Sequence, residues 1–136
     1  MSLGSGPPPD RTRIVIADDD RSFAEMLRTA LVAHDQFDVV SIAGDGAEAV
    51  AEAERLKPDL ILIDLVMPGF DGVEATRRIS ELPDPPAVIL ITGEDVSATD
   101  VKAYEAGAAA YLRKTQDLPS LIDVIVAFSR FSTTSA

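Results

Sequence analysis

Residues 60–64 read Leu-Ile-Leu-Ile-Asp, an uninterrupted apolar run that stops at an acid. Two other runs share this plan: Ile14-Val15-Ile16-Ala17 precedes a pair of acids, and Val88-Ile89-Leu90-Ile91 precedes Thr92. Continuously apolar strands are typical of parallel sheets that helices cover on both faces. Because the carboxyl ends of parallel strands meet at one edge of the sheet, we expect these polar side chains to share a single crevice.

The remainder of the chain alternates between short β-rich segments and segments with helical spacing. The predicted strands cover residues 13–17, 37–43, 59–63, 87–91 and 109–112. The second and fifth are the least continuously apolar, so we place them at the edges of the sheet. If the acids after the first and third strands share one cation, those strands are neighbours, and right-handed crossovers then give the order 2-1-3-4-5. The prediction is one α/β domain of the flavodoxin-like (βα)5 type, doubly wound around a five-stranded parallel sheet.

Polar residues mark where the helices are expected to begin and end. Asp117 precedes the fifth helix, and four other N-cap candidates stand three residues before an acid, as in a capping box: Ser22, Asp45, Asp71 and Ser97. Asp20 is a second candidate cap for the first helix. Lys57-Pro58 is expected to close the second helix and Gly107 the fourth.

Composition narrows the class of protein. The 136 residues suffice for one domain with a core, and 46% of them are apolar. The net charge of −11 argues against nucleic-acid binding by this segment, because phosphate contacts need clustered Lys and Arg. The chain has no cysteine for a disulfide or a thiolate site, and no apolar run approaches the roughly 20 residues that span a membrane. We expect a cytoplasmic domain over residues 13–130, a disordered tail with an expression scar over 1–12, and the start of a linker over 131–136.

Three acids, Asp18, Asp19 and Asp64, would repel one another in the predicted crevice. Two carboxylates about 4 Å apart repel by roughly 4 kcal/mol at an effective dielectric constant near 20. A bound cation removes this cost. Oxygen ligands without a nearby His or Cys favour a hard ion, and a shallow site that also admits water and phosphate oxygens favours Mg²⁺ over Ca²⁺.

The same crevice has the parts needed for phosphoryl transfer. An aspartate carboxylate can attack phosphorus to form an acyl phosphate. Asp64 is the predicted nucleophile because it stands alone at the end of the central strand. Mg²⁺, the ammonium of Lys114 and the hydroxyl of Thr92 would then neutralise charge on the three phosphoryl oxygens.

These residues carry a family resemblance. The set Asp18-Asp19, Asp64, Thr92 and Lys114, with Met-Pro-Gly-Phe-Asp-Gly at 67–72, closely resembles the receiver domain of two-component response regulators. The resemblance spans residues 13–130. It implies the fold of the chemotaxis regulators, a phosphoryl group accepted on Asp64 from a sensor histidine kinase, and a requirement for Mg²⁺. It also implies a signalling module, not an enzyme, that catalyses only its own phosphorylation and dephosphorylation.

The resemblance assigns metal ligands residue by residue. It implies that Asp19 binds the metal directly and that Asp18 acts through a water molecule. Asp64 and the backbone carbonyl of Val66 would complete the protein ligands.

The resemblance also implies a switch. Thr92 and Lys114 would contact the phosphoryl group, and Tyr111 would turn inward when the Thr92 hydroxyl is drawn to it. The readout is expected on the fourth helix, the fifth strand and the fifth helix, a face that also suits a homodimer. Thr115 stands where many family members have proline, which favours a trans bond after Lys114.

The output is the least determined part of the function. The residues that come after Lys114 and the turn at Asp84-Pro85-Pro86 are similar to receivers attached to helix-turn-helix domains. This similarity implies control of transcription through a DNA-binding domain that the chain lacks. A standalone receiver that acts by protein contact is the alternative.

Other classes fit the sequence less well. A Mg²⁺-dependent aspartyl phosphatase of the haloacid-dehalogenase kind places an acid two residues after its nucleophile, where this chain has Val66. A dinucleotide-binding domain needs glycines in its first strand-to-helix turn, but here that turn is Asp18-Asp19-Asp20-Arg21. A receiver-like scaffold that works without phosphate is disfavoured by the complete set of acids, Thr and Lys.

Overall fold

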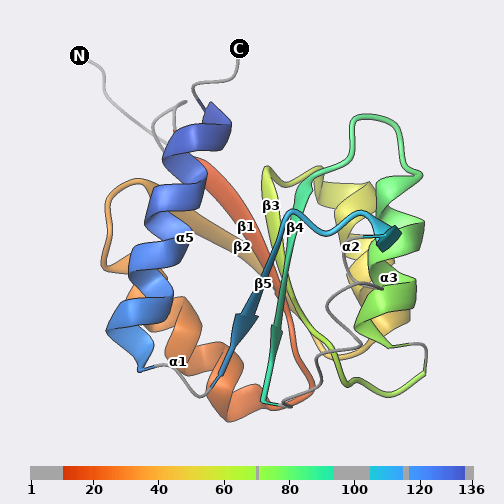
Figure 1. The fold of residues 1–136 in the computed structure, drawn as a ribbon, viewed down its shortest axis with the longest axis horizontal. Helices are drawn as coiled ribbons and strands as arrows, with labels where there is room; N and C mark the ends of the chain where they lie inside the picture. Colours follow the sequence, from red (N-terminus) through yellow and green to blue (C-terminus); the bar gives the residue numbers. More distant parts are fainter. Residues whose placement is uncertain (1–10, 70, 94–104, 115–116, 134–136) are drawn as a thin grey trace.

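The computed structural model describes residues 11–69, 71–93, 105–114 and 117–133 (Figure 1). In chain order its elements are β1 (Thr12–Ala17), α1 (Arg21–Val32), β2 (Phe37–Ala43), α2 (Gly46–Leu56), β3 (Leu60–Asp64), α3 (Gly72–Ser80), β4 (Ala87–Thr92), β5 (Ala110–Arg113) and α5 (Leu118–Thr133). The five strands pair in parallel in the order β2-β1-β3-β4-β5. The predicted fold class and strand order are therefore confirmed.

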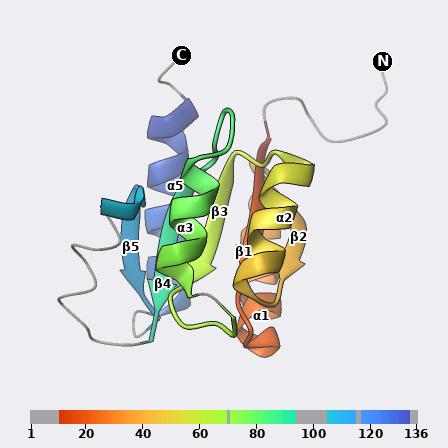
Figure 2. The ribbon, with the colours of Figure 1, turned by 90° about the vertical axis from the view of Figure 1, so that its right-hand side faces the viewer.

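Helices cover both faces of the sheet. The helices α1 and α5 lie on one face and α2 and α3 on the other (Figures 1 and 2). Alternate residues of β1 enter the two cores: Ile14 and Ile16 pack with α1 and α5, while Val15 and Ala17 pack with α2 and α3. All four are buried, as is the whole of β3. Burial of each large aliphatic side chain contributes about 1.5–3 kcal/mol, so these central strands form a rigid support for the polar residues at their carboxyl ends.

β3 and β4 end one residue later than the apolar pattern predicted, whereas β1 ends at Ala17 as expected. Asp64 is the last residue of β3 and Thr92 the last residue of β4. The strands continue because backbone pairing does not depend on side-chain polarity: Asp64 is still in register with Ile91. β1 begins at Thr12 and α5 continues to Thr133, into the segments predicted as tail and linker. Residues 1–10 and 134–136 lie outside the described residues.

The helix caps agree with the sequence except at α1. Asp45 and Asp71 accept hydrogen bonds from the third residue of α2 and α3, and Asp117 accepts one from Ser120. The assignment of Ser22 as the N-cap of α1 is wrong, and the second candidate, Asp20, is confirmed: its carboxylate accepts from the Phe23 backbone N–H.

Two of the predicted helix ends lie among the described residues. The predicted end of α2 at Lys57-Pro58 is confirmed, and Lys57 closes the helix in the left-handed conformation. Gly107 has φ 115°, a conformation that favours glycine. The helix predicted from Ser97 lies outside the described residues.

A carboxylate on α2 connects this helix to the edge strand β2. The Ser41 hydroxyl donates to Glu52 at 2.5 Å, and the Arg55 guanidinium donates to it at 2.8 Å. The hydrogen bond from Arg55, followed by that from Ser41, lowers the pKa of Glu52 to about 2.

This network makes the stability of the fold depend on pH. A lowered pKa means that Glu52 stabilises the fold above its ordinary pKa of 4.5, and that this contribution is lost as the pH falls toward 2. Glu52→Gln should therefore lower the midpoint of urea unfolding at pH 7, and the difference from the parent should shrink at pH 3. Glu54→Gln, an exposed position on the same helix, is the control and should change neither midpoint. A Glu52→Gln effect that is equally large at both pH values would contradict this account.

No helix in the described part of the chain is long and apolar enough to cross a bilayer.

Candidate functional site

Three carboxylates meet where β1 and β3 end. Because β1 and β3 are in register through Ala17 and Ile63, Asp18 and Asp64 come to lie side by side at the next position. The Asp18 backbone N–H donates to the Ala43 carbonyl at 2.9 Å, which anchors the chain where it leaves the sheet. Oxygens of Asp18, Asp19 and Asp64 lie within 4.8 Å of one another. The gathering predicted from the sequence is confirmed.

Lys114 reaches this cluster from the end of β5, the edge strand that is separated from β3 by β4. Its backbone N–H donates to the Thr92 carbonyl at 2.7 Å, which continues the pairing of β5 with β4 beyond the end of β5. Its ammonium lies 2.7 Å from the Asp18 carboxylate and 3.3 Å from that of Asp64. Residues from the ends of β1, β3 and β5 are thus joined by one cation.

Burial and crowding change the acidity of these groups. Burial, followed by the charge of Asp18, raises the pKa of Asp64 to about 6, against the opposing effect of Lys114. Burial alone would lower the pKa of Lys114, but its hydrogen bond and charge interaction with Asp18, and then with Asp64, raise it. One ammonium therefore does not compensate the whole negative charge of the cluster. A hard divalent cation fits this donor set, since it would favour the charged form of Asp64.

Thr92 and Tyr111 occupy neighbouring strands. Thr92 ends β4 and its side chain is fully buried. Tyr111 is partly buried on β5, in register with Leu90, and packs against the core on the α2 and α3 side. The two predicted switch residues therefore lie near the carboxyl ends of the strands, where the acidic cluster is. Thr115 lies outside the described residues.

The loop after β3 passes directly beside Asp64. The Val66 backbone N–H points to the Asp64 carboxylate at 3.4 Å, while the Val66 side chain is 55% exposed. The loop turns at Gly69, where φ is +80°, and returns to the sheet at Gly72, whose N–H donates to the Leu65 carbonyl at 2.8 Å.

Sequence reasoning missed the roles of two residues at this site, Gly72 and Phe23. A Cβ on Gly72 would lie 2.5 Å from the Asp64 carbonyl oxygen, so this glycine permits α3 to pack on the end of β3. Phe23 packs against the core on the α1 and α5 side, and its ring also lies against the Lys114 ammonium, which is 4.4 Å from the ring centroid. Neither role could be inferred from the sequence, because Gly72 is constrained by how α3 packs on the end of β3 and Phe23 by Lys114, a residue far away in the chain.

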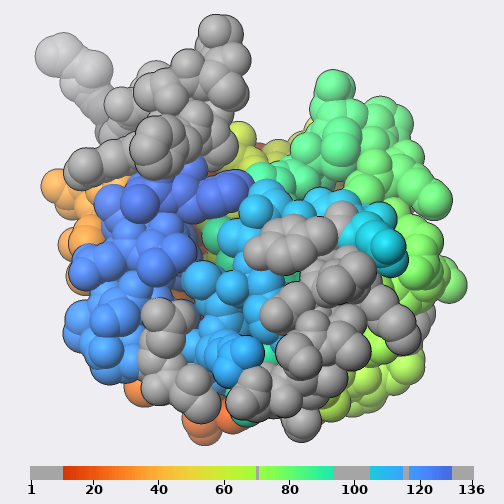
Figure 3. Space-filling model, in the orientation of Figure 1, coloured from red at the N-terminus to blue at the C-terminus, as the bar shows by residue number. Residues whose placement is uncertain are grey.

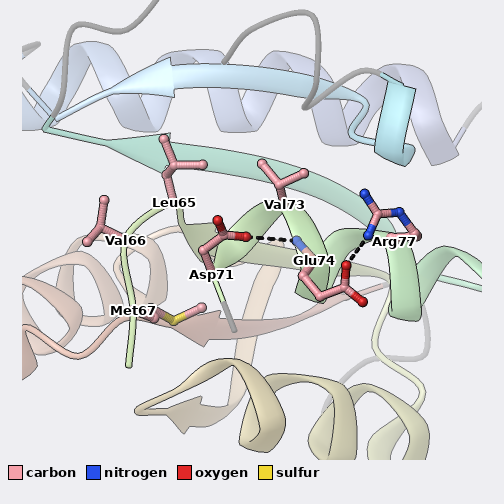
Figure 4. A pocket seen from close by; sticks show the side chains of 7 residues that line it. All are labelled: Leu65, Val66, Met67, Asp71, Val73, Glu74 and Arg77. Atoms are coloured by element: carbon pink, nitrogen blue, oxygen red, sulfur yellow. Dashed lines mark hydrogen bonds and ion pairs between the residues drawn. The ribbon is translucent and has the colours of Figure 1, made fainter. Parts of the chain in front are cut away.

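A groove of about 530 Å³ lies beside the acidic cluster and not within it. Val66 and Met67 line one end of it, and Glu74 and Arg77 of α3 line the other (Figure 4). Asp71, the N-cap of α3, accepts from the Glu74 backbone N–H, and within the helix Arg77 pairs with the Glu74 carboxylate. These contacts stabilise the helix itself.

Comparison with known proteins places this site in a family. The model of the response regulator receiver domain matches residues 14–126. The transcriptional regulatory protein LiaR of Bacillus subtilis (strain 168) is 41% identical over 122 residues, which cover 87% of this chain and 56% of that protein. A protein-glutamate methylesterase/protein-glutamine glutaminase of Myxococcus xanthus (strain DK1622) is 42% identical over 106 residues, or 77% of this chain and 30% of that protein. The chain thus spans about half the length, or less, of these curated relatives.

Solved structures agree with this assignment. The signal receiver domain of the putative response regulator NarL from Mycobacterium tuberculosis superposes with a TM-score of 0.84 at 30% identity, covering 90% of this chain and 98% of that one. The response regulator domain of Thermotoga maritima CheB gives a TM-score of 0.83 at 26% identity, with 93% and 98% covered. The relatives share this domain although their names assign them different activities, transcriptional regulation in one and methylesterase activity in another. The chain therefore belongs to the response regulator receiver domain family.

Proposed function

We propose that this receiver domain accepts a phosphoryl group on Asp64 from a sensor histidine kinase, in a reaction that requires Mg²⁺. The observation that carries the proposal is the arrangement of Lys114, whose ammonium contacts the Asp18 and Asp64 carboxylates at once. Asp64 is thereby presented beside a fixed positive charge and next to two further carboxylates that suit a hard cation.

The transfer follows from the positions of these groups. An Asp64 oxygen attacks phosphorus, the bond from phosphorus to the histidine nitrogen of the donor breaks, and the imidazole leaves with the bonding electron pair. Lys114 stays within reach of Asp64 to balance charge on one phosphoryl oxygen, and the Thr92 hydroxyl is assigned a second. Asp18, Asp19 and the Val66 carbonyl would hold Mg²⁺ beside Asp64, where its charge offsets that of the third oxygen.

The residues favour a long-lived acyl phosphate over rapid turnover. Hydrolysis by an aspartyl phosphatase needs a general acid/base beside the nucleophile. The exposed side chain nearest along the loop is that of Val66, which has no proton to transfer. We therefore propose a signalling module whose chemistry is limited to its own phosphorylation and dephosphorylation.

The proposed output is control of transcription through a domain outside this chain. The name of the LiaR relative supports this choice, because it is a transcriptional regulatory protein that extends well beyond the shared region. The proposed switch is Thr92 with Tyr111, read out on a face to which β5 and α5 contribute (Figure 3). A homodimer through that face belongs to the same proposal. A standalone receiver would instead pass the signal by direct protein contact.

Acetyl phosphate with Mg²⁺ tests the phosphoryl acceptor. Intact-mass measurement of the treated protein should show the gain of one phosphoryl group, and the same treatment with excess EDTA should show none. The small donor replaces the unidentified kinase, so the result depends only on the chain itself. No gain in the presence of Mg²⁺ would overturn the proposed function.

Mg²⁺ should also stabilise the fold in the absence of any phosphoryl donor. A ligand that binds only the folded state adds about 2.7 kcal/mol at 100 times its Kd, so the thermal midpoint should rise with Mg²⁺ at constant ionic strength. Asp19→Asn should lose most of this rise. Asp20→Asn is the matched control, because Asp20 caps α1 and Asn is an equally good cap. An equal rise in both variants would show that the cation binds elsewhere.

A further inference from the structure

The Lys114 ammonium has an aromatic neighbour in addition to its two carboxylates. Its Nζ lies over the Phe23 ring, 4.4 Å from the centroid. A cation within about 6 Å of a ring centroid is attracted by the negative face of the π system. The side chain of Lys114 is only 19% exposed, so water weakens this attraction less than it would at the surface. The ammonium therefore contacts three groups: Asp18 in the turn after β1, Asp64 at the end of β3 and Phe23 on α1.

The position of the Phe23 ring is determined by the acidic residues 18–20, which form the turn between β1 and α1. The Phe23 backbone N–H donates to the Asp20 carboxylate at 3.1 Å, and the Asp20 backbone N–H donates to that of Asp18 at 2.8 Å. These bonds set where α1 begins, and hence where its third residue projects. Phe23 also packs against the core on the α1 and α5 side and borders the same small space as Asp18 and Asp64. The ring is thus held in place beside the Asp18 and Asp64 carboxylates.

A ring held in place matters for the position of the Lys114 ammonium, because the lysine side chain is flexible. Its four-carbon stem allows the ammonium many positions, and Asp18 at 2.7 Å competes for it with Asp64 at 3.3 Å. Phosphoryl transfer needs the ammonium near Asp64. An aromatic face keeps its attraction for the ammonium when charge on the carboxylates is redistributed, because the ring carries no net charge.

We propose that Phe23 is a positioning residue for phosphoryl transfer: its ring keeps the Lys114 ammonium within reach of Asp64. The inference rests on the proposed function of Asp64 as acceptor. Phe23 itself touches neither the phosphoryl group nor the metal in this role and acts only through Lys114.

Two substitutions at Phe23 separate the ring from its apolar bulk. Phe23→Leu keeps an apolar side chain without a π face, and the rate constant for phosphoryl gain from acetyl phosphate should fall about three- to tenfold. Phe23→Tyr keeps the ring and should stay within about twofold of the parent. Urea titration establishes that each variant is folded under the assay conditions. A rate for Phe23→Leu equal to that of the parent overturns the proposal.

A double-mutant cycle tests whether Phe23 acts through Lys114. In a Lys114→Met background, which has no ammonium, Phe23→Leu should cause no further loss of rate. The same three- to tenfold loss in that background would show that Phe23 supports the site by packing alone, which overturns the proposal.

Nuclear magnetic resonance tests the contact without any phosphoryl chemistry. A ring current over the Lys114 ε-methylene protons should move them upfield in the parent and in Phe23→Tyr, and they should return to the ordinary lysine position in Phe23→Leu. Phosphoryl gain in a parent without the upfield shift contradicts this inference alone. An upfield shift in a parent that gains no phosphoryl group contradicts the proposed function, and this inference falls with it.

Discussion

Asp64→Asn should gain no phosphoryl group from acetyl phosphate in the presence of Mg²⁺. The substitution keeps the size and shape of the side chain but replaces the nucleophilic carboxylate with an uncharged amide. It also removes one of the two carboxylates that contact the Lys114 ammonium, at 3.3 Å. The variant would therefore lack both the acceptor and a contact that positions the ammonium. Intact mass after treatment should show one added phosphoryl group in the parent and none in the variant.

Asp59→Asn is the matched control for this experiment. Asp59 directly precedes β3, so it lies at the end of the strand opposite to Asp64. Its carboxylate accepts from the Arg13 backbone N–H at 2.8 Å. An amide oxygen can accept the same bond. This variant should gain the phosphoryl group as the parent does. Equal gain in Asp64→Asn and the parent would place the acceptor on another residue.

Gly72→Ala should be among the most destabilising single substitutions in the domain. Its Cβ would lie 2.5 Å from the Asp64 carbonyl oxygen, 2.9 Å from the Leu65 Cα and 3.0 Å from a Leu90 methyl group. The two nearest atoms belong to the backbone at the end of a buried strand and cannot rotate away. We expect the free energy of unfolding to fall by about 2–3 kcal/mol, at the upper end of what overpacking costs. Helix propensity alone predicts the opposite sign, since alanine is favoured over glycine in helices.

Gly93→Ala separates this effect from the general consequence of replacing a glycine. Among the residues that the structure describes, nothing lies within 4 Å of a Cβ built at Gly93, so the unfolding free energy of this variant should change by less than about 0.5 kcal/mol. Urea titrations of the two variants and the parent provide the comparison. The Gly72→Ala variant should also gain the phosphoryl group more slowly, because α3 can be accommodated only by a shift of the backbone at Asp64. A Gly72→Ala variant as stable as the parent would contradict the packing account.

Much of the fold could be predicted because its signals are local. Continuous apolar runs at 14–17, 60–63 and 88–91 identify strands buried on both faces, and the mixed run at 37–43 identifies an edge. The error at α1 has a physical origin. Ser22 and Asp20 are both acceptable caps in isolation, and the choice is made by the Asp18 carboxylate, which accepts from the Asp20 backbone and turns the chain into the helix.

Which residues form the site could be predicted more completely than the interactions between their side chains. Placing Asp18, Asp19 and Asp64 in one crevice required only the topology of a parallel sheet. The sharing of the Lys114 ammonium between Asp18 and Asp64 could not be inferred, because it depends on side-chain reach across two strands.

By itself, the sequence determined which strands form, their order, and which carboxylates, hydroxyl and amine stand at their carboxyl ends. These properties depend on residue type and spacing along the chain, and the pattern of apolar residues is the main signal of secondary structure. Only the tertiary structure decided that Lys114 lies between Asp18 and Asp64 with Phe23 against its ammonium, and that Gly72 must lack a side chain. Such contacts join segments far apart in the chain at distances of a few ångströms, and close packing in the folded state alone sets them.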